Sequence, residues 1–203
     1  MGWWIFGKKR VEGADEAYKM QSLKLLERFK EVKRNLDSTK NLVFRLQSNT
    51  NDSVNALSHN LNYLPHIEIS SALKNMLSFE TKILEGIDLV DRNITSGNIS
   101  QSINNIEEME KNLYNLKHHA TNLTKIIKFN SARGYVVEPH ISSILKEFGN
   151  FDKIYTNIEE AKLLLLKAKK EAEERSKAFK ELNVPNIHPE VERTLDELSG
   201  REK

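Results

Sequence analysis

Apolar residues recur at alternating steps of three and four along most of this chain, and this spacing constrains the fold more than any other feature. The clearest run lies near the start of the chain, with Thr39 filling one gap in the apolar series. Residues at this spacing line one side of an α-helix and form the seam of a coiled coil. The members are Leu25, Phe29, Val32, Leu36, Val43 and Leu46. A chain with this pattern buries its apolar surface by packing helix against helix.

The composition agrees with helices rather than sheets. Charged residues make up 30% of the 203 residues and apolar residues 38%, with only eight Gly and four Pro, a balance that favours long helices. No stretch of useful length alternates apolar and polar residues at the period of two that a half-buried strand needs. We expect an all-α fold, an elongated antiparallel helical bundle or set of hairpins with coiled-coil-like seams.

The first helix is expected to begin near Ala14, after a segment bracketed by Gly7 and Gly13. The run Ser48–Ser53 consists of short polar residues that commonly form turns and helix caps. It predicts either a turn between two helices or a polar patch within one long helix, and we favour the turn. Pro65 is expected to end the segment that follows, because proline lacks a backbone donor and clashes with the preceding turn.

Two further helices are expected over 68–93 and 99–129, joined by a short turn over 95–98 that makes them an antiparallel hairpin. The first carries the stripe Ile69, Leu73, Met76, Ile83, Ile87, Val90 and Ile94, and the second carries Ile103, Ile106, Met109, Leu113, Leu116, Ala120, Leu123 and Ile127. Glu80 is the one interruption of the first stripe. Two interpretations are open: a carboxylate at the bundle edge or paired with a lysine, or a buried residue that sets helix register.

The last long helix is expected to run from Pro139 to Leu182. Its inward stripe is Ile141, Ile144, Phe148, Phe151, Tyr155, Ile158, Leu165, Ala168, Ala172 and Phe179. A stiff linker with two prolines follows, and then Val191, Leu195 and Leu198 form a short amphipathic helix, which is predicted to fold on a partner. The expected organisation is therefore a segment at 1–13, a helical bundle over 14–183, and a linker with a partner-binding helix over 184–203.

Several classes of function lack support in the sequence. There is no cysteine, and there is no phosphate-binding loop, nucleophile elbow or pair of histidines four residues apart. Neighbouring His118 and His119 point about 100° apart on a helix. We expect no enzymatic activity, no cofactor and no metal. The net charge of +2 and the lack of recognisable motif spacing among the first helix's cations give no case for nucleic acid.

The N-terminal residues suggest a membrane surface instead. The apolar residues Trp3, Trp4, Ile5 and Phe6 are followed, after Gly7, by the cations Lys8, Lys9 and Arg10. Trp and Phe favour the headgroup region of a bilayer, and adjacent cations are attracted to anionic lipid. The longest apolar runs are four residues, Trp3–Phe6 and Leu163–Leu166, whereas a spanning helix needs roughly twenty. The pattern predicts peripheral attachment on the cytoplasmic side of a membrane.

The order of these features resembles the ESCRT-III family of membrane-remodelling filament proteins and their archaeal cell-division relatives. The similar parts are Met1–Arg10, the basic helix over 14–47 and the tail helix with Val191, Leu195 and Leu198. The resemblance implies a homo-oligomer, and a tail that recruits an AAA ATPase. The family's tail motif usually has Arg before its central Leu, where this chain has Thr194.

The sequence thus predicts a non-enzymatic helical scaffold or filament-forming protein on an anionic membrane. The alternative is a soluble coiled-coil adaptor whose N-terminal residues pack on its own bundle.

Overall fold

The computed structural model describes the backbone of residues 3–59, 66–134 and 139–181, and the burial of most side chains in these ranges from residue 22 onward. Within these ranges every element is helical. The elements are α1 (Trp3–His59), α2 (His66–Thr95), α3 (Ile99–Ala132), α4 (Pro139–Glu147), the 3₁₀ turn η1 (Phe148–Asn150) and α5 (Phe151–Glu181). The predicted all-α helical bundle is confirmed.

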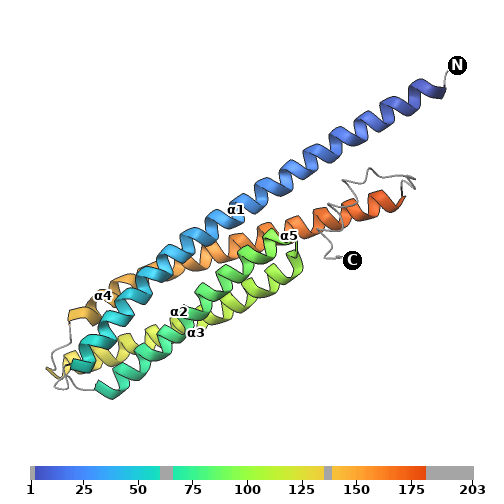
Figure 1. Ribbon diagram of the computed structural model, residues 1–203. Helices are drawn as coiled ribbons and strands as arrows, with labels where there is room; N and C mark the ends of the chain where they lie inside the picture. The colour runs from blue at the N-terminus through green and yellow to red at the C-terminus, as the bar shows by residue number, and fades with distance from the viewer. Residues whose placement is uncertain (1–2, 60–65, 135–138, 182–203) are drawn as a thin grey trace.

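Four long helices form an antiparallel bundle, in which α1 lies between α2 and α5, and α3 packs against both α2 and α5 (Figure 1). Polar pairs show the relative directions. Lys33 pairs with Asp91 and Lys40 pairs with Asp88, so α2 runs against α1. The shorter α4 packs on α1 ahead of η1 and α5. Since successive helices reverse direction, the bundle has an up-down-up-down topology.

The core follows the apolar stripes. Each of the four long helices contributes a row of buried residues, and the α1 row includes the buried Thr39 at the gap in its seam. The largest fully buried side chains are Leu46, Leu57, Leu73, Met76, Ile83, Ile106, Met109, Leu116, Leu123, Ile141, Ile144 and Ile154. Removal of such side chains from water is the main term that stabilises a bundle.

Helix α1 corrects two of the boundaries predicted for the N-terminal half. It begins at Trp3 rather than near Ala14, and it continues as a helix through Ser48–Ser53, so the predicted turn is wrong. The physical reason lies in the hydroxyls of this run. Thr50 and Ser53 are buried and direct their hydroxyls to the carbonyls four residues earlier. These contacts satisfy the polar side chains inside the helix.

The hairpin of α2 and α3 is confirmed. Gly97 in its turn has φ 76°, a left-handed conformation that glycine adopts without the steric cost of a side chain. Asn98 caps α3, because its side chain accepts a hydrogen bond from the Gln101 backbone N–H at 3.1 Å. At the other end of α3, Gly134 has φ 82°, as expected for a glycine that follows a helix.

The long helix predicted from Pro139 is interrupted at η1. The inward stripe keeps its phase across the turn, since Ile144 before it and Ile158 after it are both buried. One position differs: Ile154 is buried, and Tyr155, predicted to face inward, is 50% exposed. Within the interruption, Asn150 donates a side-chain hydrogen bond to Glu147, and the rings of Phe148 and Phe151 stack at 5.3 Å.

Candidate functional site: a buried carboxyl between two helices

The residues that the sequence singled out for membrane and partner binding lie at the two ends of the chain. Trp3, Trp4, Ile5, Phe6, Lys8, Lys9 and Arg10 belong to the helical backbone of α1, but their side chains lie outside the described part. Val191, Leu195 and Leu198 lie wholly outside the described residues. Both sites therefore remain predictions from sequence.

Within the described side chains, Glu80 is the most unusual. It is 0% exposed on α2, and it is the one residue with an ionisable side chain among the buried residues of the described part. The prediction that it reaches the bundle edge or pairs with a lysine is wrong. Its Oε1 lies 2.9 Å from the hydroxyl of Thr50 on α1, and its Oε2 has no hydrogen-bond partner in the described structure.

Burial governs the acidity of this carboxyl group. Desolvation raises the pKa of Glu80 from 4.5 to about 7, and the hydrogen bond with Thr50 opposes this rise only in part. A carboxylate in an apolar core loses its hydration, which disfavours the charged form. No cation contributes to the balance. The site is therefore a single buried acid with one polar neighbour.

The surface between α1 and α2 carries a shallow groove with apolar and charged walls. Its lining comprises Phe29, Lys30, Lys33, Leu36, Asp37, Lys40, Ile87, Asp88, Asp91, Ile94 and Thr95. Lys40 lies 2.7 Å from Asp88, and Lys33 lies 3.0 Å from Asp91. The hydrogen bond with Asp91 is the main cause that raises the pKa of Lys33. Because the lysines and aspartates of this groove neutralise one another, it lacks the uncompensated charge that would select an ionic ligand.

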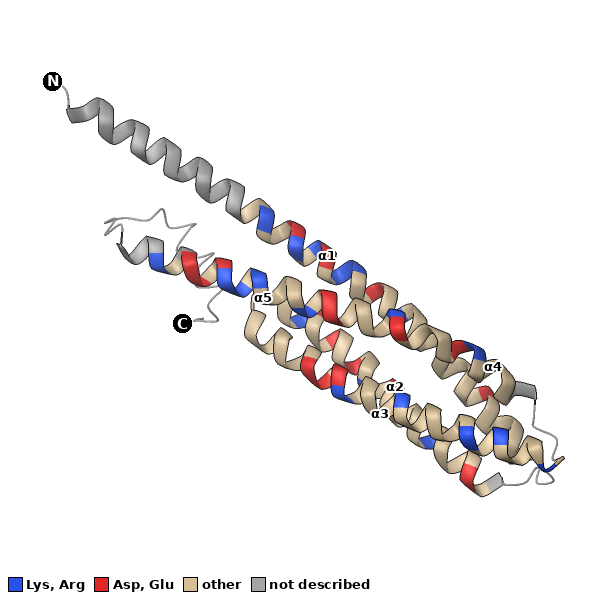
Figure 2. Cartoon of the chain, turned by 180° about the vertical axis from the view of Figure 1, so that it is seen from behind, with Lys and Arg blue, Asp and Glu red and all other residues tan. Residues whose placement is uncertain are grey.

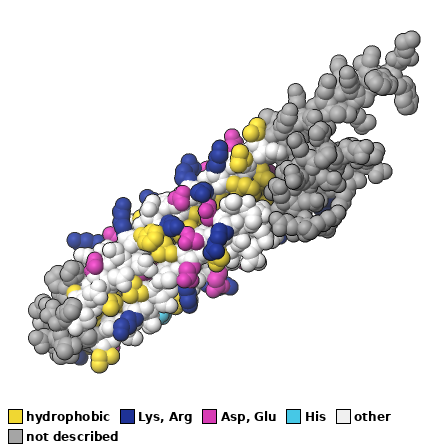
Figure 3. Space-filling view, viewed as in Figure 1, with side chains coloured by type: hydrophobic (Ala, Val, Ile, Leu, Met, Phe, Trp, Pro, Cys, Tyr) yellow, Lys and Arg dark blue, Asp and Glu magenta, His cyan; other side chains and the backbone are white. Residues whose placement is uncertain are grey.

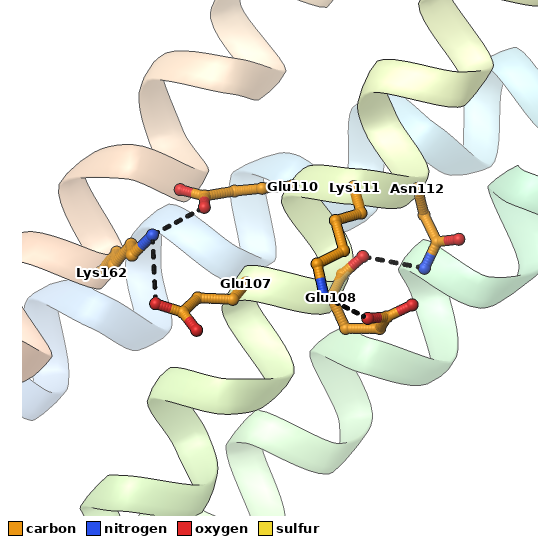
Figure 4. Close-up of polar contacts among 6 residues, drawn as sticks. All are labelled: Glu107, Glu108, Glu110, Lys111, Asn112 and Lys162. Atoms are coloured by element: carbon orange, nitrogen blue, oxygen red, sulfur yellow. Dashed lines mark hydrogen bonds and ion pairs between the residues drawn. The ribbon is translucent and has the colours of Figure 1, made fainter.

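A second polar cluster joins α3 to α5 (Figure 4). Lys162 of α5 lies 2.7 Å from Glu110 and 3.4 Å from Glu107, both on α3. The hydrogen bond with Glu110 is the largest cause that raises the pKa of Lys162. This lysine is 25% exposed at its side chain. The cluster is an ion pair that holds two helices in register, and it contains no feature of a catalytic centre.

Both α1 and α5 continue past the turn between α2 and α3 (Figure 1). Leu25 remains buried there, and Arg28 of α1 pairs with Glu171 of α5 at 2.6 Å. Neighbouring Leu23 and Leu26 of α1 are 57% and 51% exposed. Figure 3 shows apolar side chains exposed at this end of the described surface. Lysines, arginines and acids are otherwise interspersed along the helices, without a large region of one sign (Figure 2).

The described residues contain no cluster of three or more His, Cys, Asp or Glu side chains placed to hold a metal ion. His118 and His119 lie edge to face at 5.9 Å, and His119 stacks on Phe79 at 5.5 Å. A search of the described helices also found none whose length and hydropathy would let it cross a bilayer.

Comparisons with known proteins identified no relative of this chain. No family model, no curated protein and no solved structure matches the chain.

Sequence reasoning found half of the buried site. The gap in the α2 stripe marks Glu80 as unusual, whereas the polar neighbours of Thr50 predict a turn at that position. A signal for the pair exists in the α1 seam, since Thr39, Leu46, Thr50, Ser53 and Leu57 continue its spacing at steps of three, four and seven. A helix of 3.6 residues per turn therefore carries the seam through the polar run.

Proposed function

We propose that this chain is a non-enzymatic helical scaffold that attaches peripherally to an anionic membrane surface and self-associates there. The observation that carries the proposal is the juxtaposition of Trp3–Phe6 with Lys8–Arg10 at the start of the same continuous helix that forms one side of the bundle. An anchor that is continuous with a core helix transmits the position of the membrane directly to the bundle.

The energetics favour reversible attachment. Full burial of each large apolar side chain contributes roughly 1.5–3 kcal/mol, and each cation near anionic lipid contributes about 1 kcal/mol. Partial burial of the four apolar residues and the charge of the three cations sum to several kcal/mol before the entropy of association is subtracted. One copy would bind weakly, whereas an array of copies would bind stably. Attachment of this kind therefore requires assembly.

Helix continuity supports attachment in the plane of the surface. Along the sequence, Trp3, Gly7, Val11, Ala14 and Tyr18 recur at steps of three and four, the spacing of an apolar stripe on a helix. Lys8, Glu12, Asp15 and Lys19 have the same spacing in a separate polar series. A helix with such a pattern places Trp3 toward the acyl chains at the interface of a bilayer, whereas Ile5 and Phe6 lie on other sides, because successive residues point about 100° apart.

Exposed residues of α1 support self-association. Leu23 and Leu26 are more than half exposed, in the part of α1 that continues past the α2–α3 turn. In this part of α1, which α2 does not reach, two neighbouring exposed leucines form an apolar surface on which another helix can pack. A second copy of this chain supplies the same stripe, so the contact is self-complementary.

The membrane-remodelling role and the recruitment of an AAA ATPase through Val191, Leu195 and Leu198 rest on the resemblance to ESCRT-III proteins. We include both in this proposal. The assembled scaffold remodels the membrane from its cytoplasmic side, and the AAA ATPase is its expected partner.

Co-sedimentation with vesicles tests the anchor. Vesicles of phosphatidylcholine with phosphatidylserine should pellet the full chain at low salt, and vesicles of phosphatidylcholine alone should pellet much less. Deletion of residues 1–10, or the double substitution Trp3→Ser with Trp4→Ser, should abolish pelleting. The matched control is Lys24→Gln with Lys30→Gln, which removes two exposed cations from the same helix outside the anchor. Undiminished binding after deletion of residues 1–10 would show that the anchor proposal is wrong.

The alternative, a soluble adaptor with a packed N-terminus, makes a different prediction. It requires residues 3–10 to fold back on the bundle, and α1 continues from Trp3 without a turn at Gly7 or Gly13. In that case tryptophan fluorescence would be blue-shifted without lipid, and protease would spare the first ten residues. The membrane proposal expects solvent-exposed emission that shifts to the blue when anionic vesicles are added.

A further inference from the structure

The two contacts of the Thr50 hydroxyl indicate whether the Glu80 carboxyl carries a proton. The Thr50 hydroxyl oxygen lies 2.9 Å from the Leu46 carbonyl oxygen and also 2.9 Å from Glu80 Oε1. A threonine hydroxyl has one hydrogen to donate and can accept through its lone pairs. A carbonyl oxygen can only accept. Thr50 has a single hydrogen for these two acceptors, and it can give that hydrogen wholly to Leu46 when Glu80 donates to Thr50. That arrangement requires Glu80 to be a neutral carboxylic acid.

The surroundings favour the same state. The other polar residues in the core of the described part are the uncharged Thr39, Thr50, Ser53, Ser102, Asn112 and Asn130. On α3, His118 and His119 lie at this level of the bundle, since His119 stacks on Phe79, the residue before Glu80. On α1, Arg45 and Asp52 are exposed, and on α2 itself Lys82 lies over the Phe79 ring. None of these five groups contributes to the raised pKa of Glu80.

We propose that Glu80 is a proton-operated latch between α1 and α2: it closes the bundle as a neutral acid donating to Thr50, and loss of its proton loosens α2 from α1. Ionisation leaves a charged oxygen, Oε2, in the core without a hydrogen-bond partner. It also turns the Thr50 hydroxyl away from Leu46, because the carboxylate can no longer donate. Separation of the two helices admits water to the carboxylate and relieves both defects.

The direction of the pH dependence follows from the raised pKa. Below pH 4.5 the carboxyl is protonated whether the latch is open or closed, so the pH has no effect through this group. Between 4.5 and about 7 the open form gives up its proton while the closed form keeps it, so the opening equilibrium rises about tenfold per pH unit. Above about 7 the closed form also ionises and the rise levels off.

Amide hydrogen exchange of the full chain, resolved by peptide, tests the latch. Glu80→Gln keeps the shape and a donor to Thr50 but cannot ionise. The ratio of exchange rates between the wild type and Glu80→Gln at the same pH cancels the base catalysis of exchange. We expect this ratio in 46–57 of α1 and 73–84 of α2 to rise about tenfold per pH unit between 5 and 7 and to flatten above 7. Glu85→Gln, on the exposed side of the same helix, should show no such change.

Two results would overturn the latch. One is a ratio that stays constant with pH in both segments. The other is equal protection and an equal rise over all described helices, which would show that these segments open only by global unfolding.

A second measurement does not depend on whether the variant folds. In wild-type protein labelled with carboxyl ¹³C glutamate, the Glu80 signal should titrate with a midpoint near 7. A Glu80 midpoint near 4.5 would refute the proton assignment and the latch with it.

Discussion

Glu80 and Thr50 illustrate how single polar residues shape this bundle. A carboxyl whose pKa is about 7 in the fold and 4.5 in the unfolded chain differs in free energy between the two states by about 3 kcal/mol. Total stabilities of small domains are about 5–15 kcal/mol, so this one residue matters on the scale of the whole fold. Its contribution is lost as the pH rises from 4.5 to 7, because the unfolded chain then holds fewer protons than the native state.

Thr50→Val tests the hydrogen bond at this site. Valine has the same shape, but it leaves Glu80 without a polar neighbour in the described core. We expect a loss of about 1–3 kcal/mol in the free energy of unfolding. When Glu80 is ionised, Thr50 donates to the carboxylate and lowers its pKa, so removal of the hydroxyl raises that pKa further. The loss should therefore be larger at pH 8 than at pH 5, as measured by urea denaturation at both values.

Thr50→Ser is the matched control, since it keeps the hydroxyl. It should lose less stability than Thr50→Val, and the loss should be nearly the same at pH 5 and pH 8. A Thr50→Val variant as stable as the wild type at pH 8 would contradict the assigned contact.

At the scale of helices, the close approach of α2 and α3 depends on one glycine. A Cβ atom on Gly86 would lie 2.4 Å from Cγ and 3.0 Å from Sδ of Met109. These are shorter than any van der Waals contact, so a side chain at this position forces the methionine or the helix to move. The hairpin packs closely because Gly86 has no side chain there, although glycine is an unfavourable residue inside a helix.

Gly86→Ala should therefore destabilise the bundle by about 1–2 kcal/mol, since the overpacking outweighs the gain in helix propensity. The measurement is the thermal or denaturant midpoint by circular dichroism. Gly149→Ala is the control, because a Cβ there meets nothing within 4 Å, and it should be neutral or slightly stabilising.

A double-mutant cycle makes the cause of this loss explicit. In the background Met109→Ala, the change Gly86→Ala should no longer destabilise, because the atoms that it would meet are gone. An equal loss of stability from Gly86→Ala in the wild type and in Met109→Ala would show that the contact with Met109 is not the cause.

At the scale of the whole molecule, the bundle has two regions of different composition. Over most of its length four helices enclose a core, whereas beyond the α2–α3 turn α1 is paired with α5 and has no α2 beside it (Figure 1). The pair Arg28–Glu171 lies in this second region, as do the exposed Leu23 and Leu26. Leu23 and Leu26 pack little against the rest of their own chain, so both are available for contact with a second chain.

Leu23→Ser with Leu26→Ser should weaken self-association and leave the fold intact, since both side chains are more than half exposed. Sedimentation velocity over a range of protein concentrations, with and without anionic vesicles, measures the effect. Leu163→Ser is the control, because this leucine is 50% exposed on α5 and is not assigned to the seam. Unchanged sedimentation of the double variant would show that Leu23 and Leu26 do not mediate self-association.

Periodicity along the sequence determined the fold class and the hairpin of α2 and α3, together with most of the core. A helix repeats every 3.6 residues, so residues that share a face can be identified without knowledge of the partner helix. The predicted turn over 95–98 is where Gly97 has its positive φ value.

Tertiary structure decided what local preference left open. The polar run Ser48–Ser53 has the composition of a turn, yet it is helical, because packing against α2 outweighs the weak preferences of single residues. The choice of Ile154 over Tyr155 for the core likewise depends on how α5 packs against α1 and α3.

The sequence by itself determined that Glu80 interrupts an apolar stripe; only the tertiary structure decided that its neighbour is Thr50. These residues lie thirty positions apart, on helices whose register is set by the whole interface. Hydrogen bonds between helices depend on that register, and one-dimensional periodicity contains no information about it.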